Sequence, residues 1–122
     1  MIDAIQGVID LITPWEGVTV WRGQLRKGYD NTYPAVVVTL DTDAHADSGS
    51  ARRVGLSFRV YGGSASSAAA REIYHELCER LTAASSDTVL RVGQLSGQEL
   101  PPDPVEGWPA FNLRAVARIT ER

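Results

Sequence analysis

The stretch that most constrains the fold is VGLSFRVY, residues 54–61, where hydrophobic and small or polar residues alternate without a break. Successive side chains of a strand point to opposite faces, so this run predicts a strand with one face in a core. Gly62 and Gly63 end it, and serines that can cap a helix follow. Residues 65–84 then show helical periodicity. The apolar stripe of this predicted helix consists of Ala70, Ile73, Leu77, Leu81 and Ala84.

Other segments complete an α-β-β-β-α-β-β order. Apolar residues from Ile2 to Ile12 recur at helical spacing, and Pro14 ends that short helix. Strands are predicted at 17–23, 35–40, 54–61, 88–95 and 109–119, and polar connections at 24–33 and 41–53. The AVVVTL run at 35–40 is rich in β-branched residues and is expected to be buried on both faces. The predicted class is α+β, a mostly antiparallel sheet with the helices packed on one face.

Composition narrows the function classes. The chain has 122 residues, which predicts a single domain over 1–122, and a net charge of −3 without a basic run. A duplex-binding protein would normally present a cationic face. The lone Cys78 excludes an internal disulfide and fits a reducing compartment. The N-terminal segment lacks a basic region, and no apolar stretch approaches the roughly 20 residues of a membrane span. We expect a protein made in the cytoplasm with no membrane partner.

The helix segment HELCE resembles a zinc-protease motif only in part. His75 is followed four residues later by Glu79, where that motif needs a second histidine. Cys78 lies near His75 in sequence, but no nucleophile, base and oxyanion donor assemble around it. The sequence therefore predicts no catalytic residues, no cofactor and no enzyme activity.

The acidic stretch DTDAHAD is the strongest candidate for a metal site. Asp41, Asp43, His45 and Asp47 alternate, so an extended chain would point them the same way. A calcium loop starting at Asp41 needs glycine and glutamate at its sixth and twelfth positions, which hold Ala46 and Arg52. A solvated acidic loop is the preferred interpretation. A small metal-dependent or ligand-binding domain using these four residues remains the alternative.

The succession of segments resembles a known family. The runs YPAVVVTL, GLSFRVYG, SSAAAREIYHELCERL and DPVEGWPAFNLRAVARI are similar, in this order, to the tail terminator proteins of long-tailed bacteriophages. The resemblance extends from about residue 2 to residue 119 and is carried by element order rather than by one motif. It implies an α/β subunit that forms a hexameric ring in the neck of the virion.

The resemblance also implies partners. The ring would cap the tail tube protein and dock to the head-completion or connector protein, and DNA would pass through without specific binding. Assembly would take place in the host cytoplasm. Other neck proteins, such as head-closure or tube-like subunits, are the alternative.

The loop LPPDPVEGWPA, residues 100–110, is the predicted contact between subunits. Its prolines, Pro104 and Pro109 among them, fix φ and lower the entropy that the loop would lose on docking. Gly107 permits a turn, and Trp108 supplies a large anchor. The rival interpretation is that Trp108 folds back on its own sheet and fills the edge of the core.

Charged residues beside the acidic stretch give two further expectations. Asp41, Asp43 and Asp47 are predicted to face the lumen or the tube, because a cationic lining would hold DNA phosphates. Arg52 and Arg53 are predicted to pair with an acidic neighbour at an interface.

Overall fold

The computed structural model describes residues 4–43, 51–83, 85–86, 89–100 and 107–120. Its elements are α1 (Ala4–Ile12), β1 (Thr19–Arg22), β2 (Ala35–Asp43), β3 (Ala51–Tyr61), α2 (Ser67–Ala83), β4 (Val89–Leu100) and β5 (Ala110–Thr120). This order matches the predicted one, and the α+β class is confirmed. Within the described residues, no helix is long and apolar enough to cross a membrane.

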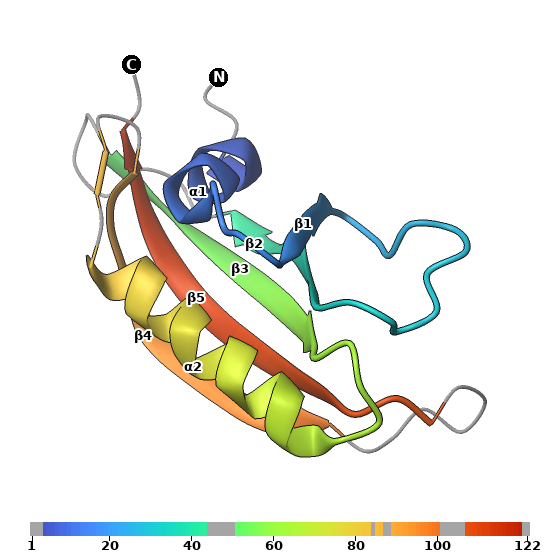
Figure 1. The fold of residues 1–122 in the computed structure, drawn as a ribbon. Helices are drawn as coiled ribbons and strands as arrows, with labels where there is room; N and C mark the ends of the chain where they lie inside the picture. The colour runs from blue at the N-terminus through green and yellow to red at the C-terminus, as the bar shows by residue number, and fades with distance from the viewer. Residues whose placement is uncertain (1–3, 44–50, 84, 87–88, 101–106, 121–122) are drawn as a thin grey trace.

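The strands form a sheet in the order β1-β2-β3-β5-β4 (Figure 1). β1 runs parallel to β2, and the other neighbouring pairs are antiparallel. β5 is therefore inserted between β3 and β4, and it pairs with β3 from Ala51↔Thr120 to Tyr61↔Ala110. Because β5 has a hydrogen-bonded neighbour on each side, its residues from 110 to 119 are central rather than at an edge.

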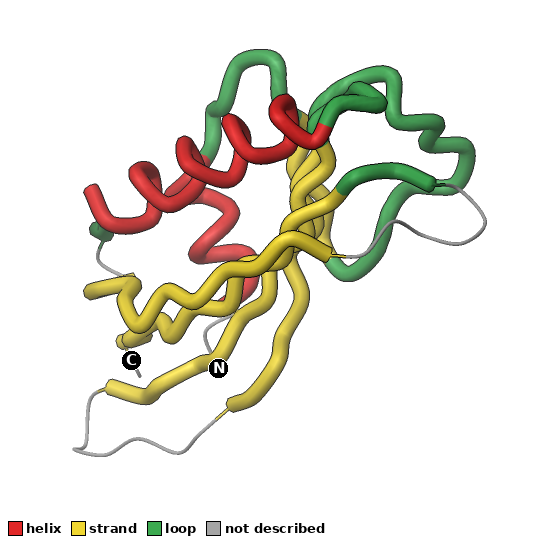
Figure 2. The backbone as a smooth tube through the Cα atoms, turned by 90° about the horizontal axis from the view of Figure 1, so that it is seen from below, coloured by secondary structure: helices red, strands yellow, loops and turns green. Residues whose placement is uncertain are grey.

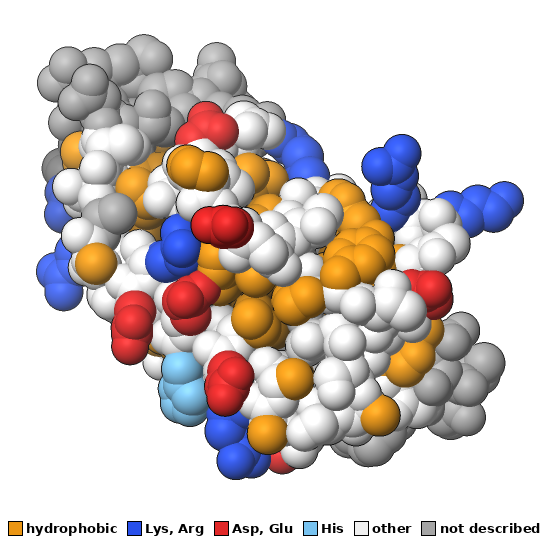
Figure 3. Space-filling view, in the orientation of Figure 1, with side chains coloured by type: hydrophobic (Ala, Val, Ile, Leu, Met, Phe, Trp, Pro, Cys, Tyr) orange, Lys and Arg blue, Asp and Glu red, His pale blue; other side chains and the backbone are white. Residues whose placement is uncertain are grey.

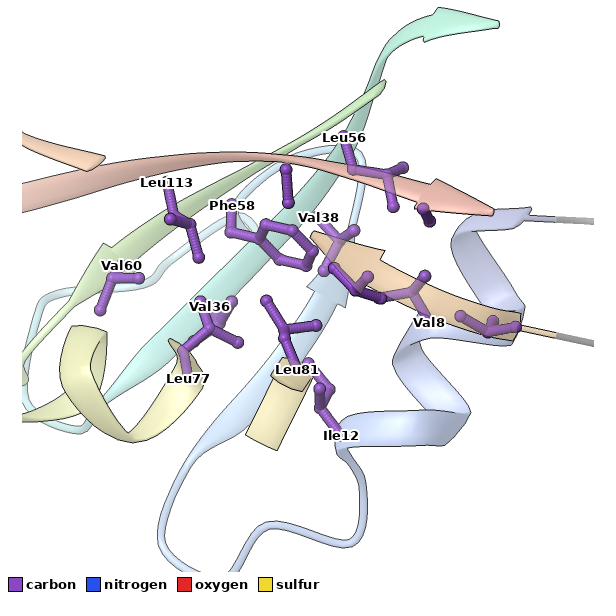
Figure 4. Packing of buried hydrophobic residues seen from close by; sticks show 14 of the residues in the cluster. Val8, Ile12, Val36, Val38, Leu56, Phe58, Val60, Leu77, Leu81 and Leu113 are labelled. Atoms are coloured by element: carbon purple, nitrogen blue, oxygen red, sulfur yellow. The ribbon is translucent and has the colours of Figure 1, made fainter. Parts of the chain in front are cut away.

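The helices α1 and α2 lie on the same face of the sheet, as Figure 2 shows. Leu77 and Leu81 of α2 and Val8 and Ile12 of α1 are fully buried there. Figure 4 shows these side chains pointing toward strand residues. The labelled strand residues of this core are Val36, Val38, Leu56, Phe58, Val60 and Leu113. The predicted burial of Leu77 and Phe58 is confirmed, because each has 0% exposure.

The alternating strand at the centre of the prediction is also confirmed. Val54, Leu56, Phe58 and Val60 are buried under the helices, whereas Arg53 and Arg59 are exposed on the other side. The side of the sheet that the helices leave uncovered is called the open face below.

Burial on both faces, predicted for residues 35–40, is confirmed only along Ala35–Val38. Thr39 is half-buried and Leu40 is 49% exposed, so the prediction was wrong for the end of this run. Val36 and Val38 join the core under the helices. Ala35 and Val37 join a second hydrophobic cluster on the open face, together with Tyr29. The connection between β1 and β2, predicted as a polar loop, thus covers one end of the open face.

Several strand ends differ from the predicted ones. The connection predicted at 41–53 is shorter, because β2 continues to Asp43 and β3 begins at Ala51. β4 continues to Leu100 rather than ending near residue 95. Its pairing with β5 shifts register between Gly93 and Ser96, and Gln94 has a φ of 52° there. A bulge of this kind breaks the period-2 pattern, so the sequence concealed the second half of the strand.

Specific contacts fix the helices in place. The Ser66 hydroxyl accepts a hydrogen bond from the Ala68 amide at 3.2 Å, which caps the start of α2. Arg80 of α2 donates to the Ile12 and Pro14 carbonyls at 3.2 and 3.3 Å. These carbonyls lie at and just beyond the end of α1, where backbone acceptors lack helical partners. The guanidinium also lies 4.7 Å from the Trp15 ring centroid, so Arg80 ties α2 to α1.

Candidate interaction surfaces

Aromatic side chains gather at one end of the sheet, on the open face. We call Trp21, Tyr29, Tyr33, Tyr61 and Trp108 the aromatic cluster. Tyr29 is its centre, since its ring lies 5.1 to 5.7 Å from each of the other four. Most of these pairs are edge-on, a geometry that adds about 0.5–1.5 kcal/mol per pair beyond area burial. The cluster therefore joins the β1–β2 connection to the start of β5.

A buried polar pair anchors the cluster to the turn after β3. The Tyr29 hydroxyl donates to the Tyr33 carbonyl at 2.7 Å and lies 3.1 Å from Asn31 Oδ1. Asn31 Nδ2 donates to the Ser64 carbonyl, and Asn31 Oδ1 accepts from the Gly63 amide. Burial raises the pKa of Tyr29 well above its ordinary value. The β1–β2 connection is thus fastened to residues that follow it by more than thirty positions.

The predicted interface loop is described only from Gly107 onward, so Pro104 lies outside the described residues. Gly107 has a φ of 69°, which fits the turn expected there. Trp108 is half-buried and its ring lies 5.5 Å from Tyr29 and 6.3 Å from Tyr61. Pro109 is half-buried as well. Trp108 therefore contacts its own subunit, as the rival interpretation expected, and keeps part of its surface exposed.

Only the first part of the acidic stretch, residues 41–43, lies within the described residues. Asp41 accepts hydrogen bonds from Arg114 Nε at 3.1 Å and from Arg114 Nη2 at 2.5 Å, on the open face. The β2–β3 register shifts between Leu40 and Thr42, which places Asp43 opposite the core residue Val54. The bulge interrupts the alternation from which a common direction was predicted. His45 and Asp47 lie outside the described residues.

Metal binding finds no support among the described side chains. Within that part of the chain, no group of three or more His, Cys, Asp or Glu residues is placed to hold a metal ion. Asp41 is already engaged by Arg114. The backbone of Arg52, in β3, lies opposite that of Ile119 in β5.

The helix residues considered for catalysis are not brought into a reactive arrangement. Burial raises the pKa of the Cys78 thiol, which is the reverse of what an activated cysteine needs. His75 is exposed, and its ring contacts Tyr74 rather than a carboxylate. Tyr74 stacks on Phe111 at 5.3 Å and lies over Gly97, where a side chain would collide with it. These residues hold α2 against β4 and β5.

The open face beyond the aromatic cluster carries arginines. Arg59 lines a hollow of about 370 Å³ together with Tyr61 and Asn112. Arg53, Arg91 and Arg118 line another hollow of about 190 Å³. Arg59, Arg114 and Arg118 stood at polar positions of alternating runs, so their direction was visible in the sequence. Their assembly into a surface depends on strand order, which the sequence did not reveal.

The described residues thus define an α+β protein, with helices on one face of a mostly antiparallel sheet and an arginine-rich open face. No protein-family model matches this chain, and no curated protein sequence matches it. Among solved structures, its fold is similar to a chain described as "Virion of native gene transfer agent (GTA) particle", with a TM-score of 0.56 and 16% sequence identity. The alignment covers 98% of this chain and 87% of that chain. At this identity the similarity establishes the fold.

Proposed function

We propose that this chain is a structural subunit of a phage-like virion. In this proposal it forms a homo-oligomeric ring, a hexamer, that caps the tail tube and joins it to the head connector. The subunit acts in the neck of the particle, without a cofactor and without catalysis. DNA passes through the ring and is not bound specifically.

The fold similarity to a virion chain carries the proposal. It covers 98% of this chain, so it concerns the whole arrangement of helices and sheet rather than a shared fragment. The order of segments in the sequence, which resembles tail terminators, points to the same kind of particle independently. The pairing of Asp41 with Arg114 also favours a structural role over the metal-dependent alternative.

We also propose which residues contact neighbouring subunits. The exposed part of Trp108, with Gly107 and Pro109, is offered as an anchor to a neighbouring subunit, and Pro104 as part of the same loop. Aromatic side chains with apolar bodies are common at the centre of interfaces. Arg53 is exposed on the open face, where we propose that it contributes to a contact with an acidic neighbour. Arg52 is included with it by sequence position.

The acidic residues Asp41, Asp43 and Asp47 are proposed to face the lumen or the tube. Asp41 forms an ion pair with Arg114, so its charge is partly compensated. Changing the three aspartates to lysine is expected to slow DNA ejection or to block joining to the tube, because lysines hold phosphates. Normal infectivity and assembly of this triple variant would count against the lumen assignment.

The function is tested by adding the purified protein to the tail tube protein encoded with it. A terminator stops elongation, so tube length measured by electron microscopy is expected to fall as its concentration rises, with extra density at one tube end. His75→Ala, a change at an exposed helix position, serves as the matched variant that keeps full capping.

Other outcomes of the same experiment are informative. Polymerisation of the protein into tubes would identify a tube-like subunit instead. Binding to the head connector without any effect on tubes would identify a head-closure protein. Unchanged tube length together with no connector binding would overturn the neck assignment.

A further inference from the structure

Among the described strand residues, the open face is basic, in a chain whose net charge is −3. Strand alternation places the non-core residues of β3 and β5 on this face, and the register adds β4. Among the described residues, the arginines at open-face positions are Arg53, Arg59, Arg91, Arg114 and Arg118. Among the described strand residues, the acidic side chain on this face is Asp41, and it pairs with Arg114.

Three of these arginines lie side by side across the strands. Arg53 of β3 is opposite Arg118 of β5, and Arg118 is opposite Arg91 of β4. We call them the arginine row. Directly opposed residues of antiparallel strands have Cβ atoms about 5 Å apart, and like charges there destabilise the sheet. Within the described residues, no carboxylate forms an ion pair with Arg91 or Arg118.

The opposite face of the molecule, formed by the helices, is acidic. Glu72, Glu76 and Glu79 of α2 are exposed, and their spacings of four and three residues place them on one stripe. We call them the glutamate ridge. Figure 3 shows acidic side chains over the part of this face that α2 occupies. The basic residues of α2 turn to the subunit itself, since Arg71 lies over Phe111 and Arg80 over Trp15.

We infer that the arginine row of one copy binds the glutamate ridge of the next copy. In this contact, α2 of the next copy would pack on the open face, as α2 of the same copy packs on the other face of the sheet. The two surfaces belong to opposite layers of one subunit, so the contact is head-to-tail. Such contacts repeat, and they generate a ring if the rotation between copies closes. The inference rests on the proposed ring-forming function and names the surfaces that build the ring.

A second copy explains the arginine row better than nucleic acid does. The chain is net negative, which opposes approach of a polyanion, whereas every copy brings its own glutamate ridge. In a ring built this way the arginines are covered by glutamates. They would then be withdrawn from DNA in the lumen, where cations would hold phosphates by counterion release.

Charge reversal tests the contact. The sheet variant is Arg91→Glu with Arg118→Glu, and the helix variant is Glu72→Lys with Glu79→Lys. Glu76 is left in place because it lies 3.6 Å from Arg80, which ties α2 to α1. Each variant alone is expected to weaken self-association, measured by sedimentation and native mass, by about tenfold or more.

Combining the two charge reversals tests whether the two surfaces contact each other, because self-association should then be restored. An equal mixture of the sheet and helix variants is expected to assemble, because each supplies the surface that the other lacks. The variant with all four changes has the net charge of the wild type and is also expected to assemble. Arg26→Glu with Lys27→Glu, on an exposed connection, repeats the charge change of the sheet variant and is expected to associate normally.

The outcomes separate the inference from the proposed function. Wild type that assembles, with reversed variants that assemble equally well, overturns the charged contact alone. Wild type that stays monomeric contradicts both. Duplex DNA binding that is lost in the sheet variant, while assembly is unaffected, would assign the row to nucleic acid instead.

The salt dependence of wild-type self-association provides a second test, which does not require any variant to fold. Association of the wild type is expected to weaken as salt is raised from about 0.05 M to about 0.5 M, since exposed charge pairs are screened. Association that does not respond to salt would overturn the contact.

Discussion

At the scale of single residues, the turn after β3 tolerates few residue types at its key positions. Gly63 has a φ of 73°, and a Cβ there would lie 2.5 Å from the Tyr33 carbonyl carbon. Asn31 is buried with a φ of 58° and bonds both Gly63 and Ser64. Asparagine tolerates this left-handed conformation better than most residues. The sequence identified the glycine pair as a strand end but gave no sign that a loop thirty residues earlier packs on it.

Gly63→Ala tests this turn. The left-handed φ costs a residue with a Cβ about 1–2 kcal/mol, and the contact with Tyr33 adds to that cost. The expected loss is about 3 kcal/mol or more, measured by urea unfolding. Gly28→Ala is the matched control, because Gly28 has a φ of 90° with open space around it and should lose only the φ component. Equal losses in the two variants would show that the contact with Tyr33 does not matter.

Because Tyr29 is buried, we expect the stability of the fold to depend on pH in the alkaline range. Its folded pKa is raised by burial, whereas an unfolded tyrosine titrates near pH 10. The unfolded state therefore loses this proton first, and its contribution to stability, complete below about pH 10, falls as pH rises above that value. Melting temperatures from about pH 8 to about pH 11 should decline more steeply for the wild type than for Tyr29→Phe. Parallel declines would assign the alkaline sensitivity to other groups.

At the scale of elements, periodic segments were predictable and interrupted ones were not. The period-2 run at 54–61 and the helix stripe through Leu77 appear in the structure as β3 and α2. The second half of β4 was missed because its bulge places Gln94 at positive φ and breaks the pattern. The insertion of β5 between β3 and β4 depends on long-range pairing, which periodicity does not encode. The arginine row could not be predicted for that reason.

Leu77→Ala measures how firmly α2 is held. Leu77 is fully buried between α2 and the sheet, so the change removes apolar contacts and leaves a cavity. The expected loss is about 2–5 kcal/mol in the free energy of unfolding. His75→Ala, exposed on the same helix, should change stability by less than about 0.5 kcal/mol. Similar losses for both would contradict the packing described for this helix.

Trp108→Ala separates the roles proposed for the last loop. Loss of ring contacts with Tyr29 and Tyr61 should lower the stability of the isolated subunit by about 1–3 kcal/mol. If the exposed part of the ring also anchors a neighbour, assembly below the melting temperature should weaken by about 2 kcal/mol or more. Lower stability with unchanged assembly would leave Trp108 as a residue of its own core, and the interface assignment of Gly107 and Pro109 would fall with it.

At the scale of the whole molecule, the fold separates charge between its layers. The helix layer presents carboxylates on one side (Figure 3). The described strand residues of the open face present arginines on the other. An asymmetric subunit of this kind is suited to head-to-tail association. The fold is similar to that of a virion chain, and the ring is the proposal that the resemblance of the segment order to tail terminators implies. The period-2 and period-3.6 runs predicted the α+β architecture, which the structure confirms. The contact predicted in the 100–110 loop stays a prediction, and the charged contact between the two faces is a separate inference that depends on strand order.

The proposed function and the inferred contact both require the chain to form a closed ring. Native mass spectrometry of the purified wild-type protein, across a range of concentrations, tests it most directly. We expect a discrete species of six subunits that persists on dilution and gives way to monomers as salt is raised. A protein that remains monomeric at every concentration, or that grows into open polymers without a preferred size, would contradict it.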